Sequence, residues 1–287
     1  MRLIWPVDAS LPIGNLTTDV HAKGLAVRFD VITLFPELFE PFLQSGVTRR
    51  AYASGLVHVR LWNPRDFAEG NYRRVDDRPF GGGPGMVMMA EPLEKCLLAI
   101  QQDRIAQNSK ATPVPVVLFS PIGQTLNHAR VESWSQSDGA ILICGRYEGL
   151  DQRFIDAHVD VQISLGDFVL SGGEIAALAL LDAVARLQPG VLNDEGSHQM
   201  DSFNPALDGL LDCGHFTRPE IWHDESVPSI LMSGHHADIA KWRRQQSLIL
   251  TQKHRPDLLA SARKMGKLSV KDEHFLANLS LTDPNKT

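Results

Sequence analysis

The chain has 287 residues, 43% of them hydrophobic, and its 28 Lys and Arg against 34 Asp and Glu give a net charge of −6. This length and apolar content predict one sizeable core and a smaller second one, hence two domains. The acidic balance argues against a protein that coats nucleic acid without specificity. No window reaches the roughly 18 to 20 apolar residues that a membrane span requires, so we expect no membrane segment.

The N-terminal segment and the cysteines bear on where in the cell the protein is expected. Residues 1–27 lack the basic start and the continuous apolar run of a secretory signal, and we predict a mobile N-terminal extension there. The three cysteines lie far apart, leave one unpaired in any pairing and form no C-x-x-C metal spacing. This pattern favours a reducing, cytoplasmic location.

Apolar runs alternate with Gly- and Pro-bearing segments along most of the chain. They predict strands at residues 29–34, 56–62, 114–120, 140–144 and 159–165. Helices are predicted at residues 36–52, 91–100 and 172–187, the last so apolar that it must be buried or lie at an interface. An arginine-rich loop at 63–79 runs into a flexible glycine segment at 80–86, and further helices are predicted from about Leu207.

The last three predicted strands each end in a glycine-bearing loop. Short apolar runs of this kind predict buried parallel strands, and an open α/β sheet binds its ligand at the carboxyl ends of such strands. Neither the Walker phosphate loop nor the dinucleotide pattern G-x-G-x-x-G is present. The sequence therefore predicts a backbone-lined pocket for a ligand whose reactive centre is neutral or cationic.

Basic residues gather in two places. Residues 241–267 hold eight Lys and Arg and one acid, and residues 49–78 hold seven arginines and four acids. Such surfaces suit a partner that carries phosphates, although a solvated helix face has the same composition. The residues expected to contact phosphate are Arg49, Arg50, Arg73, Arg74, Arg78, Lys241, Arg243 and Arg244.

Six motifs together carry a family resemblance. They are TLFPELF at 33–39, VDDRPFGGGPGMVM at 75–88, LICGRYEG at 142–149, SLGDFVLSGGE at 164–174, PGVL at 189–192 and LLDCGHFTRPE at 210–220. In this order and spacing the sequence resembles the bacterial tRNA (guanine-37-N1)-methyltransferases, the TrmD family. The resemblance covers nearly everything from about Arg28 to the last hundred residues.

The resemblance implies an α/β protein of the SPOUT fold, with a C-terminal trefoil knot in its first domain and a small helical C-terminal domain. The expected organisation is an extension at 1–27, the cofactor-binding domain at 28–192, a linker at 193–206 and a helical tRNA-binding domain at 207–287. It also implies S-adenosylmethionine as methyl donor, assistance by Mg²⁺, a homodimer with shared active sites, and the tRNA anticodon loop as methyl acceptor. The scattered histidines provide no metal-binding spacing from which Mg²⁺ ligands can be named.

The cofactor-binding residues follow by similarity, loop by loop. The first loop contributes Leu118, Phe119, Ser120 and Pro121, and the second Gly145, Tyr147 and Glu148. The third contributes Leu165, Gly166, Asp167, Phe168, Val169, Leu170, Gly172 and Gly173. Family members often have tyrosine where this chain has Leu118 and Phe168, so these two side chains are expected to pack against the cofactor and not to hydrogen-bond to it.

The reaction requires a base and a cation. Guanine N1 carries a proton that must leave as the methyl group arrives, and negative charge then develops towards O6. The resemblance assigns Asp201 as the general base and Arg186 as the donor to O6. Without the motifs, Asp201 would be interpreted as a turn or helix-cap residue and Arg186 as a cation at a helix end. Met200 stands where the family often has an acid, which removes a negative charge beside the base.

Two other interpretations remain open on the sequence. One is a SPOUT methyltransferase acting on ribosomal RNA, and the other is a non-catalytic RNA-binding protein that keeps the knot as a scaffold. A nucleoside-triphosphate enzyme is disfavoured because no phosphate-binding loop is present.

Overall fold

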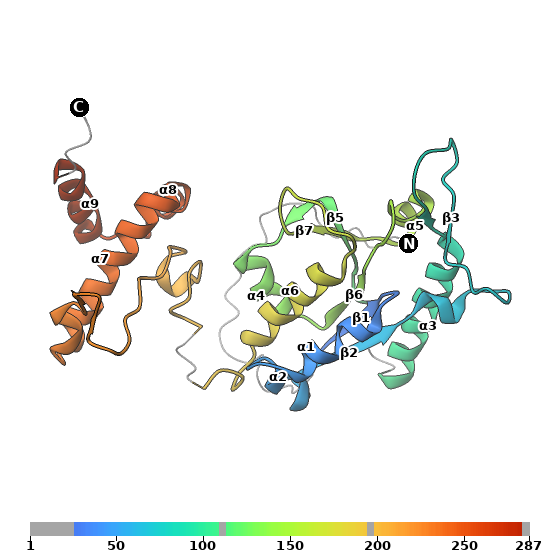
Figure 1. Cartoon of the computed structure of the whole chain (residues 1–287), viewed down its shortest axis with the longest axis horizontal. Helices are drawn as coiled ribbons and strands as arrows, with labels where there is room; N and C mark the ends of the chain where they lie inside the picture. The colour runs from blue at the N-terminus through green and yellow to red at the C-terminus, as the bar shows by residue number, and fades with distance from the viewer. Residues whose placement is uncertain (1–25, 109–112, 194–197, 283–287) are drawn as a thin grey trace. The chain divides into compact units, whose positions relative to one another are not determined.

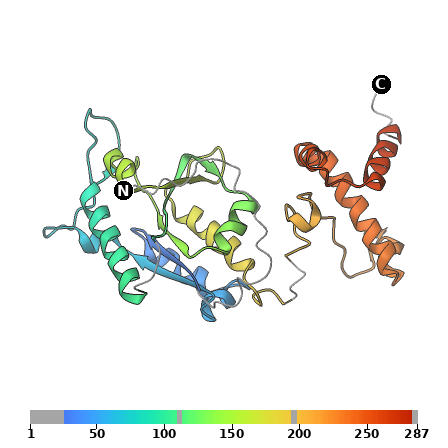
Figure 2. The same cartoon turned by 180° about the vertical axis from the view of Figure 1, so that it is seen from behind.

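The structure is a computed structural model that describes residues 26–108, 113–193 and 198–282. These residues form two compact units, with the boundary between Val191 and Leu192. The expected N-terminal extension lies outside the described residues except for its last two positions. Figures 1 and 2 show both units. No helix in the described part of the chain is long and apolar enough to cross a membrane.

The first unit is built on a five-stranded sheet in which every pairing is parallel. The order is β2-β1-β6-β5-β7, with β1 at Val27–Ile32, β2 at Val57–Trp62, β5 at Val116–Thr125, β6 at Gly139–Ile143 and β7 at Val161–Ser164. The sequence prediction of buried parallel strands is therefore confirmed. Strand β5 extends past its predicted end because residues 120–123 bulge out of the ladder, and Phe119 and Gln124 both face Ile163.

Helices cover both faces of the sheet, which is why its strands are apolar on both sides. On one face, Phe29 and Val31 pack with α6 (Glu174–Arg186), α4 (His128–Ser135) and α2 (Arg49–Ala53). On the other face, Ile32 and Ile143 pack against α3 (Ala90–Gln107) and α5 (Gln152–His158). Figures 1 and 2 show α3 and α6 on opposite sides of the sheet. The apolar helix predicted at 172–187 is thus a buried core helix.

Several helix predictions were wrong in their bounds. The single helix predicted at 36–52 is three short pieces, a 3₁₀ turn at Pro36–Leu38, α1 at Glu40–Gln44, and α2. The chain breaks between them because Ser45 is extended and Gly46 has φ +70°, a conformation that favours glycine. Helix α3 is longer than predicted, and α4 and α5 were not predicted. The side chains of Asn127 and Asp151 cap the starts of α4 and α5.

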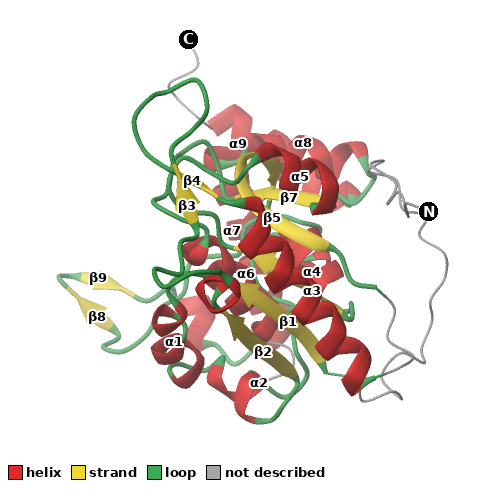
Figure 3. Ribbon diagram, turned by 90° about the vertical axis from the view of Figure 1, so that its right-hand side faces the viewer, coloured by secondary structure: helices red, strands yellow, loops and turns green. Residues whose placement is uncertain are grey.

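The arginine-rich loop contains a 3₁₀ turn, η3 (Pro64–Phe67), and leads into a small antiparallel pair. Strands β3 (Asp76–Asp77) and β4 (Val87–Met88) form this pair, and the glycine segment connects them as a projecting loop (Figure 3). Four of its glycines, Gly81, Gly82, Gly83 and Gly85, have positive φ.

In the described residues of the second unit the main helices are α7 (His236–His254), α8 (Pro256–Lys264) and α9 (Val270–Thr282). They pack around a small core of Leu210, Leu248, Leu259, Ala262 and Leu276. The prediction of helices from about Leu207 was wrong for the segment before α7. That segment has only the 3₁₀ turns Pro205–Leu207 and Ser229–Met232 and the hairpin of β8 (Ile221–Trp222) and β9 (Glu225–Ser226).

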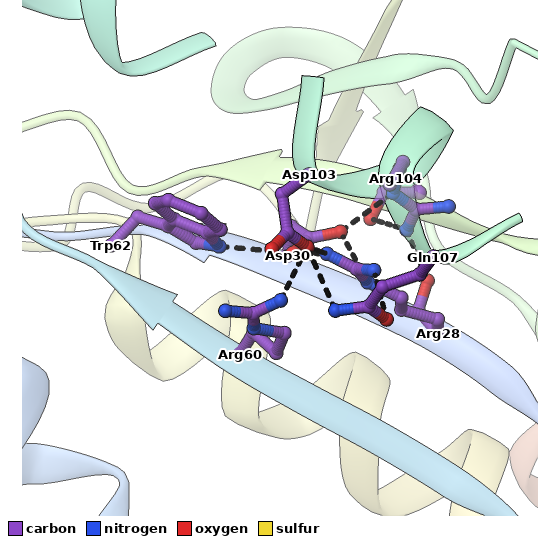
Figure 4. A network of polar contacts seen from close by, with 8 residues as sticks. Arg28, Asp30, Arg60, Trp62, Asp103, Arg104 and Gln107 are labelled. Atoms are coloured by element: carbon purple, nitrogen blue, oxygen red, sulfur yellow. Dashed lines mark hydrogen bonds and ion pairs between the residues drawn. The ribbon is translucent and has the colours of Figure 1, made fainter. Parts of the chain in front are cut away.

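A partly buried polar network lies between the sheet and the end of α3 (Figure 4). The carboxylate of Asp30, which is fully buried, accepts hydrogen bonds from Arg28 at 2.7 Å, Arg104 at 2.6 Å and Trp62 at 2.9 Å. Asp103 on α3 completes the network by pairing with Arg28 and Arg60.

The three free cysteines are also buried.

Replacing Asp30 tests this network. Asp30→Ala removes the buried counter-charge of Arg28 and Arg104. We expect the free energy of unfolding to fall by about 3 to 5 kcal/mol, measured by urea denaturation of the whole protein. The control is Glu69→Ala, which removes an exposed carboxylate paired with Lys95 and should change the midpoint little. Similar losses in both variants would contradict the interpretation.

Candidate functional site

A hollow of about 350 Å³ lies at the carboxyl ends of β6 and β7 and beside the bulge within β5, close to where the sequence analysis expected a ligand. We call it the three-loop pocket, because this bulge and the loops after β6 and β7 line it. It contains all the predicted cofactor residues except Asp167, namely Leu118, Phe119, Ser120, Pro121, Gly145, Tyr147, Glu148, Leu165, Gly166, Phe168, Val169, Leu170, Gly172 and Gly173. Its size falls in the range of small-molecule sites.

The first loop is the bulge at residues 120–123 within β5. Gly123 lies directly against the backbone of β7, where a Cβ atom would come within 2.5 Å of Gln162 C and Ile163 N. Glycine is needed there because any side chain would push the two strands apart. Leu118 is only 4% exposed and belongs to the core on the α3 face, so it shapes the floor of the pocket.

The second loop follows β6 and is tied to the projecting loop. The amide of Glu148 donates to the carbonyl of Met86 at 3.0 Å, and the amide of Met88 donates to the carbonyl of Gly149 at 2.8 Å. Tyr147 has φ +60° and a half-exposed side chain. Burial, together with the carboxylate of Asp76, raises the pKa of its hydroxyl.

The third loop begins with a tight turn after β7. The hydroxyl of Ser164 accepts a hydrogen bond from the amide of Gly166 and donates one to its carbonyl, each at 3.1 Å. The turn sends Phe168 and Val169, 55% and 84% exposed, to the rim of the pocket. These apolar side chains offer surface against which a partly apolar ligand can pack. Asp167 is exposed and does not line the pocket.

The pair Gly172-Gly173 brings the start of α6 against the second loop. A Cβ on Gly173 would lie 2.7 Å from Cys144 Cα, and the amide of Gly173 donates to the carbonyl of Gly145 at 3.0 Å. A Cβ on Gly172 would collide with Arg146 and would lie 2.6 Å from Oε2 of Glu174. Cys144 is fully buried there, and burial raises the pKa of its thiol well above the usual value.

Arg146 is a pocket residue that the sequence analysis missed. Its Nε lies 2.9 Å from Oε2 of Glu174, a close ion pair of buried atoms whose N–H is not aligned for a hydrogen bond. The other carboxylate oxygen of Glu174 accepts from the hydroxyl of Thr33 at 2.9 Å. Arg146, Glu174 and Thr33 lie in three of the resemblance motifs, LICGRYEG, SLGDFVLSGGE and TLFPELF. The motifs therefore contain all three residues but do not show that they are in contact.

The two predicted catalytic residues lie in different units. Arg186 is in the last turn of α6. Asp201 lies in a turn of the second unit, where its amide donates to the carbonyl of His198 at 3.3 Å and its carbonyl accepts from the amide of Asn204 at 3.2 Å. Neither lines the three-loop pocket within the first unit.

The predicted phosphate contacts differ in how they are held. In the second unit Arg244 is partly buried and forms ion pairs with Asp208 at 2.8 Å and Asp272 at 3.1 Å, so it is an internal structural residue. In the first unit two predicted arginines form exposed ion pairs, Arg73 with Asp66 and Arg74 with Asp77. Among the described residues, no three His, Cys, Asp or Glu side chains gather as a metal site.

Comparison with known proteins shows to which family the chain belongs. The family model described as tRNA (Guanine-1)-methyltransferase TrmD matches residues 27–261. A tRNA (guanine-N(1)-)-methyltransferase of Polaromonas sp. strain JS666 is 73% identical over 253 residues, which cover 88% of this chain and 97% of the relative. Proteins of the same name from Paracidovorax citrulli and Herminiimonas arsenicoxydans are 70% and 52% identical, over 88% of this chain and 99% and 100% of their own lengths. This chain therefore belongs to the tRNA (guanine-1)-methyltransferase family.

Proposed function

We propose that this protein transfers a methyl group from S-adenosylmethionine to N1 of the guanine at position 37 of tRNA, directly 3′ of the anticodon. The observation that carries the proposal is the three-loop pocket, in a chain that belongs to the tRNA (guanine-1)-methyltransferase family. The lining consists mainly of glycine and apolar residues with a few polar side chains such as Arg146 and Glu148, which suits a partly apolar ligand with a cationic centre, such as an adenosine joined to a sulfonium.

The same reasoning supports the SPOUT arrangement. Three features bring the loops together: the bulge at 120–123, the close contact of Gly123 with β7, and the contact of Gly173 with the loop after β6. A chain threaded through a trefoil knot requires such close contacts between its loops. We further propose a cytoplasmic homodimer with shared active sites, in which the first domain binds S-adenosylmethionine and the helical domain from about residue 207 binds the anticodon loop of tRNA.

In this proposal the protein holds its substrates and moves one proton. S-adenosylmethionine, when bound, supplies an electrophilic methyl group. The loop backbones at Ser120, Gly145 and Gly166 hold and orient it, and Phe168 and Val169 shield it from water. The anticodon-loop guanine is unpaired, so it enters without the cost of opening a duplex.

Asp201 takes the N1 proton and Arg186 donates to O6 as charge develops there. The two residues belong to different units, and in the proposed homodimer the active sites are shared between the copies. The described residues contain no ligand cluster for Mg²⁺, and we assign no step to this ion.

The function is tested by incubating purified protein with unmodified tRNA and labelled S-adenosylmethionine, then mapping the methylated nucleotide. We expect 1-methylguanosine at position 37 alone. Label in ribosomal RNA instead would identify a related enzyme of different specificity, and RNA binding without any methylated product would identify a non-catalytic protein.

Asp201→Ala removes the proposed base. We expect kcat to fall about 10²- to 10⁴-fold, with the Kd for S-adenosylmethionine unchanged, measured by single-turnover kinetics and calorimetry. Met200→Ala, which alters the neighbouring side chain, serves as control and should keep most of the activity. Undiminished turnover in the Asp201 variant would reject this residue as the base.

Arg186→Ala removes the proposed donor to O6. The expected loss in kcat is about 10²- to 10³-fold, again with cofactor binding retained, because the side chain does not line the pocket. The matched control is Arg153→Ala, which removes an arginine that is 81% exposed. A loss of cofactor affinity equal to the loss of rate would show that Arg186 acts on the pocket and not on the transition state.

Gly172→Ala tests the packing of the pocket. The added methyl group collides with Arg146 and Glu174, so the third loop must move away from the second. We expect at least a tenfold weaker Kd for S-adenosylmethionine, which corresponds to about 1.4 kcal/mol. Gly214→Ala is the control, because a Cβ there meets no atom within 4 Å, and a tight Kd in both variants would contradict the proposed role of this contact.

A further inference from the structure

Thr33, Glu174 and Arg146 form a clamp that links three separate elements. Thr33 follows β1, Arg146 belongs to the second pocket loop, and Glu174 is the first residue of α6. Thr33 is fully buried and Glu174 is 1% exposed. A carboxylate this deeply buried is costly unless a cation pairs with it, and Arg146 is the cation that the structure places there.

The clamp fixes Arg146 from several sides. Nε faces Glu174, Nη1 donates to the carbonyl of Ser171 at 3.3 Å, and the guanidinium carbon lies 4.4 Å from the centre of the Phe35 ring. Gly172 leaves the space in which the ion pair closes. Because an arginine has several rotatable bonds, these contacts select one orientation out of many.

One nitrogen of the Arg146 guanidinium, Nη2, is not used by the clamp. Within the described part of the chain, Nη2 of Arg146 has no hydrogen-bond or ion-pair partner. Arg146 also lines the three-loop pocket. A cation whose orientation is fixed, which lines a pocket and which keeps one nitrogen without a partner, is arranged to bind an oxyanion of the ligand.

We propose that Glu174 is a positioning residue: it holds Arg146 so that the Nη2 edge binds an oxyanion of the bound substrates. This inference rests on the proposed function, which offers two sources of that chemistry. One is a phosphate of the tRNA nucleotide that enters the pocket, and the other is the carboxylate of S-adenosylmethionine. Thr33 supports the arrangement by holding the second oxygen of Glu174.

The test is a double-mutant cycle of Glu174→Gln, Arg146→Gln and the combined variant. Glutamine keeps the shape of Glu174 and its contact with Thr33 but removes the charge that orients Arg146. If Glu174 acts through Arg146, both single variants weaken substrate binding about ten- to a hundredfold. The combined variant is then no worse than Arg146→Gln.

Two measurements on each variant distinguish the sources of the oxyanion. If the ligand is a tRNA phosphate, KM for tRNA rises and the slope of log KM against log salt falls by about 0.7 to 0.9, while the Kd for S-adenosylmethionine stays constant. If the ligand is the carboxylate, that Kd rises and KM for tRNA and its salt slope stay constant. If Glu174 has a purely structural role, its replacement changes neither KM for tRNA nor the Kd for S-adenosylmethionine selectively. Additive losses in the double-mutant cycle, or unchanged binding in the variants, would overturn the proposal.

Two further variants keep the result interpretable. Thr33→Val removes the hydroxyl that holds Glu174 and should give a smaller change of the same kind, even where Glu174→Gln folds poorly. Glu94→Gln removes an exposed carboxylate that pairs with His158 on α5 and should change neither measurement. If the wild-type protein methylates no tRNA, the proposed function fails. If it does and the cycle is additive, only the role of Glu174 fails.

Discussion

The three-loop pocket depends on one close approach, that of the start of α6 to the loop after β6. Gly173 lies against the backbone of Cys144, and Gly172 leaves room for the ion pair between Arg146 and Glu174. Neither contact tolerates a larger side chain, because the space is already filled by backbone or by charged groups. The third loop therefore closes over the second, and both face the bulge of β5 across the same hollow.

Strand β1 connects this site to the rest of the first unit. Asp30, in the middle of the strand, binds the arginines that hold α3, and Thr33, just beyond its end, binds Glu174 at the pocket. Each buried carboxylate lies beside arginines and hydrogen-bond donors, the condition under which a buried charge is tolerated. Helices on both faces of the sheet keep the ends of its strands in place, so the loops are presented by a rigid framework.

Much of this site could be predicted from the sequence. Runs of β-branched residues that stop at glycine identified the parallel strands. The family resemblance identified many of the residues that line the pocket, and of the predicted cofactor residues only Asp167 does not line it. The bounds of the helices were harder, because the break at Gly46 and the caps at Asn127 and Asp151 are local signals that compete with apolar periodicity. Arg146 was missed because its role comes from a contact with Glu174 on another element. That Asp201 and Arg186 act together in one active site stays a prediction, since the two residues belong to separate units.

The central claim is that the three loops bind S-adenosylmethionine together. Hydrogen–deuterium exchange of the protein with and without S-adenosylmethionine tests it most directly, because backbone amides in these loops should become protected. We expect protection at residues 118–123, 145–150 and 164–173 and unchanged exchange in α7, α8 and α9. Unchanged exchange in all three loops at saturating S-adenosylmethionine, or protection confined to the second unit, would contradict the account.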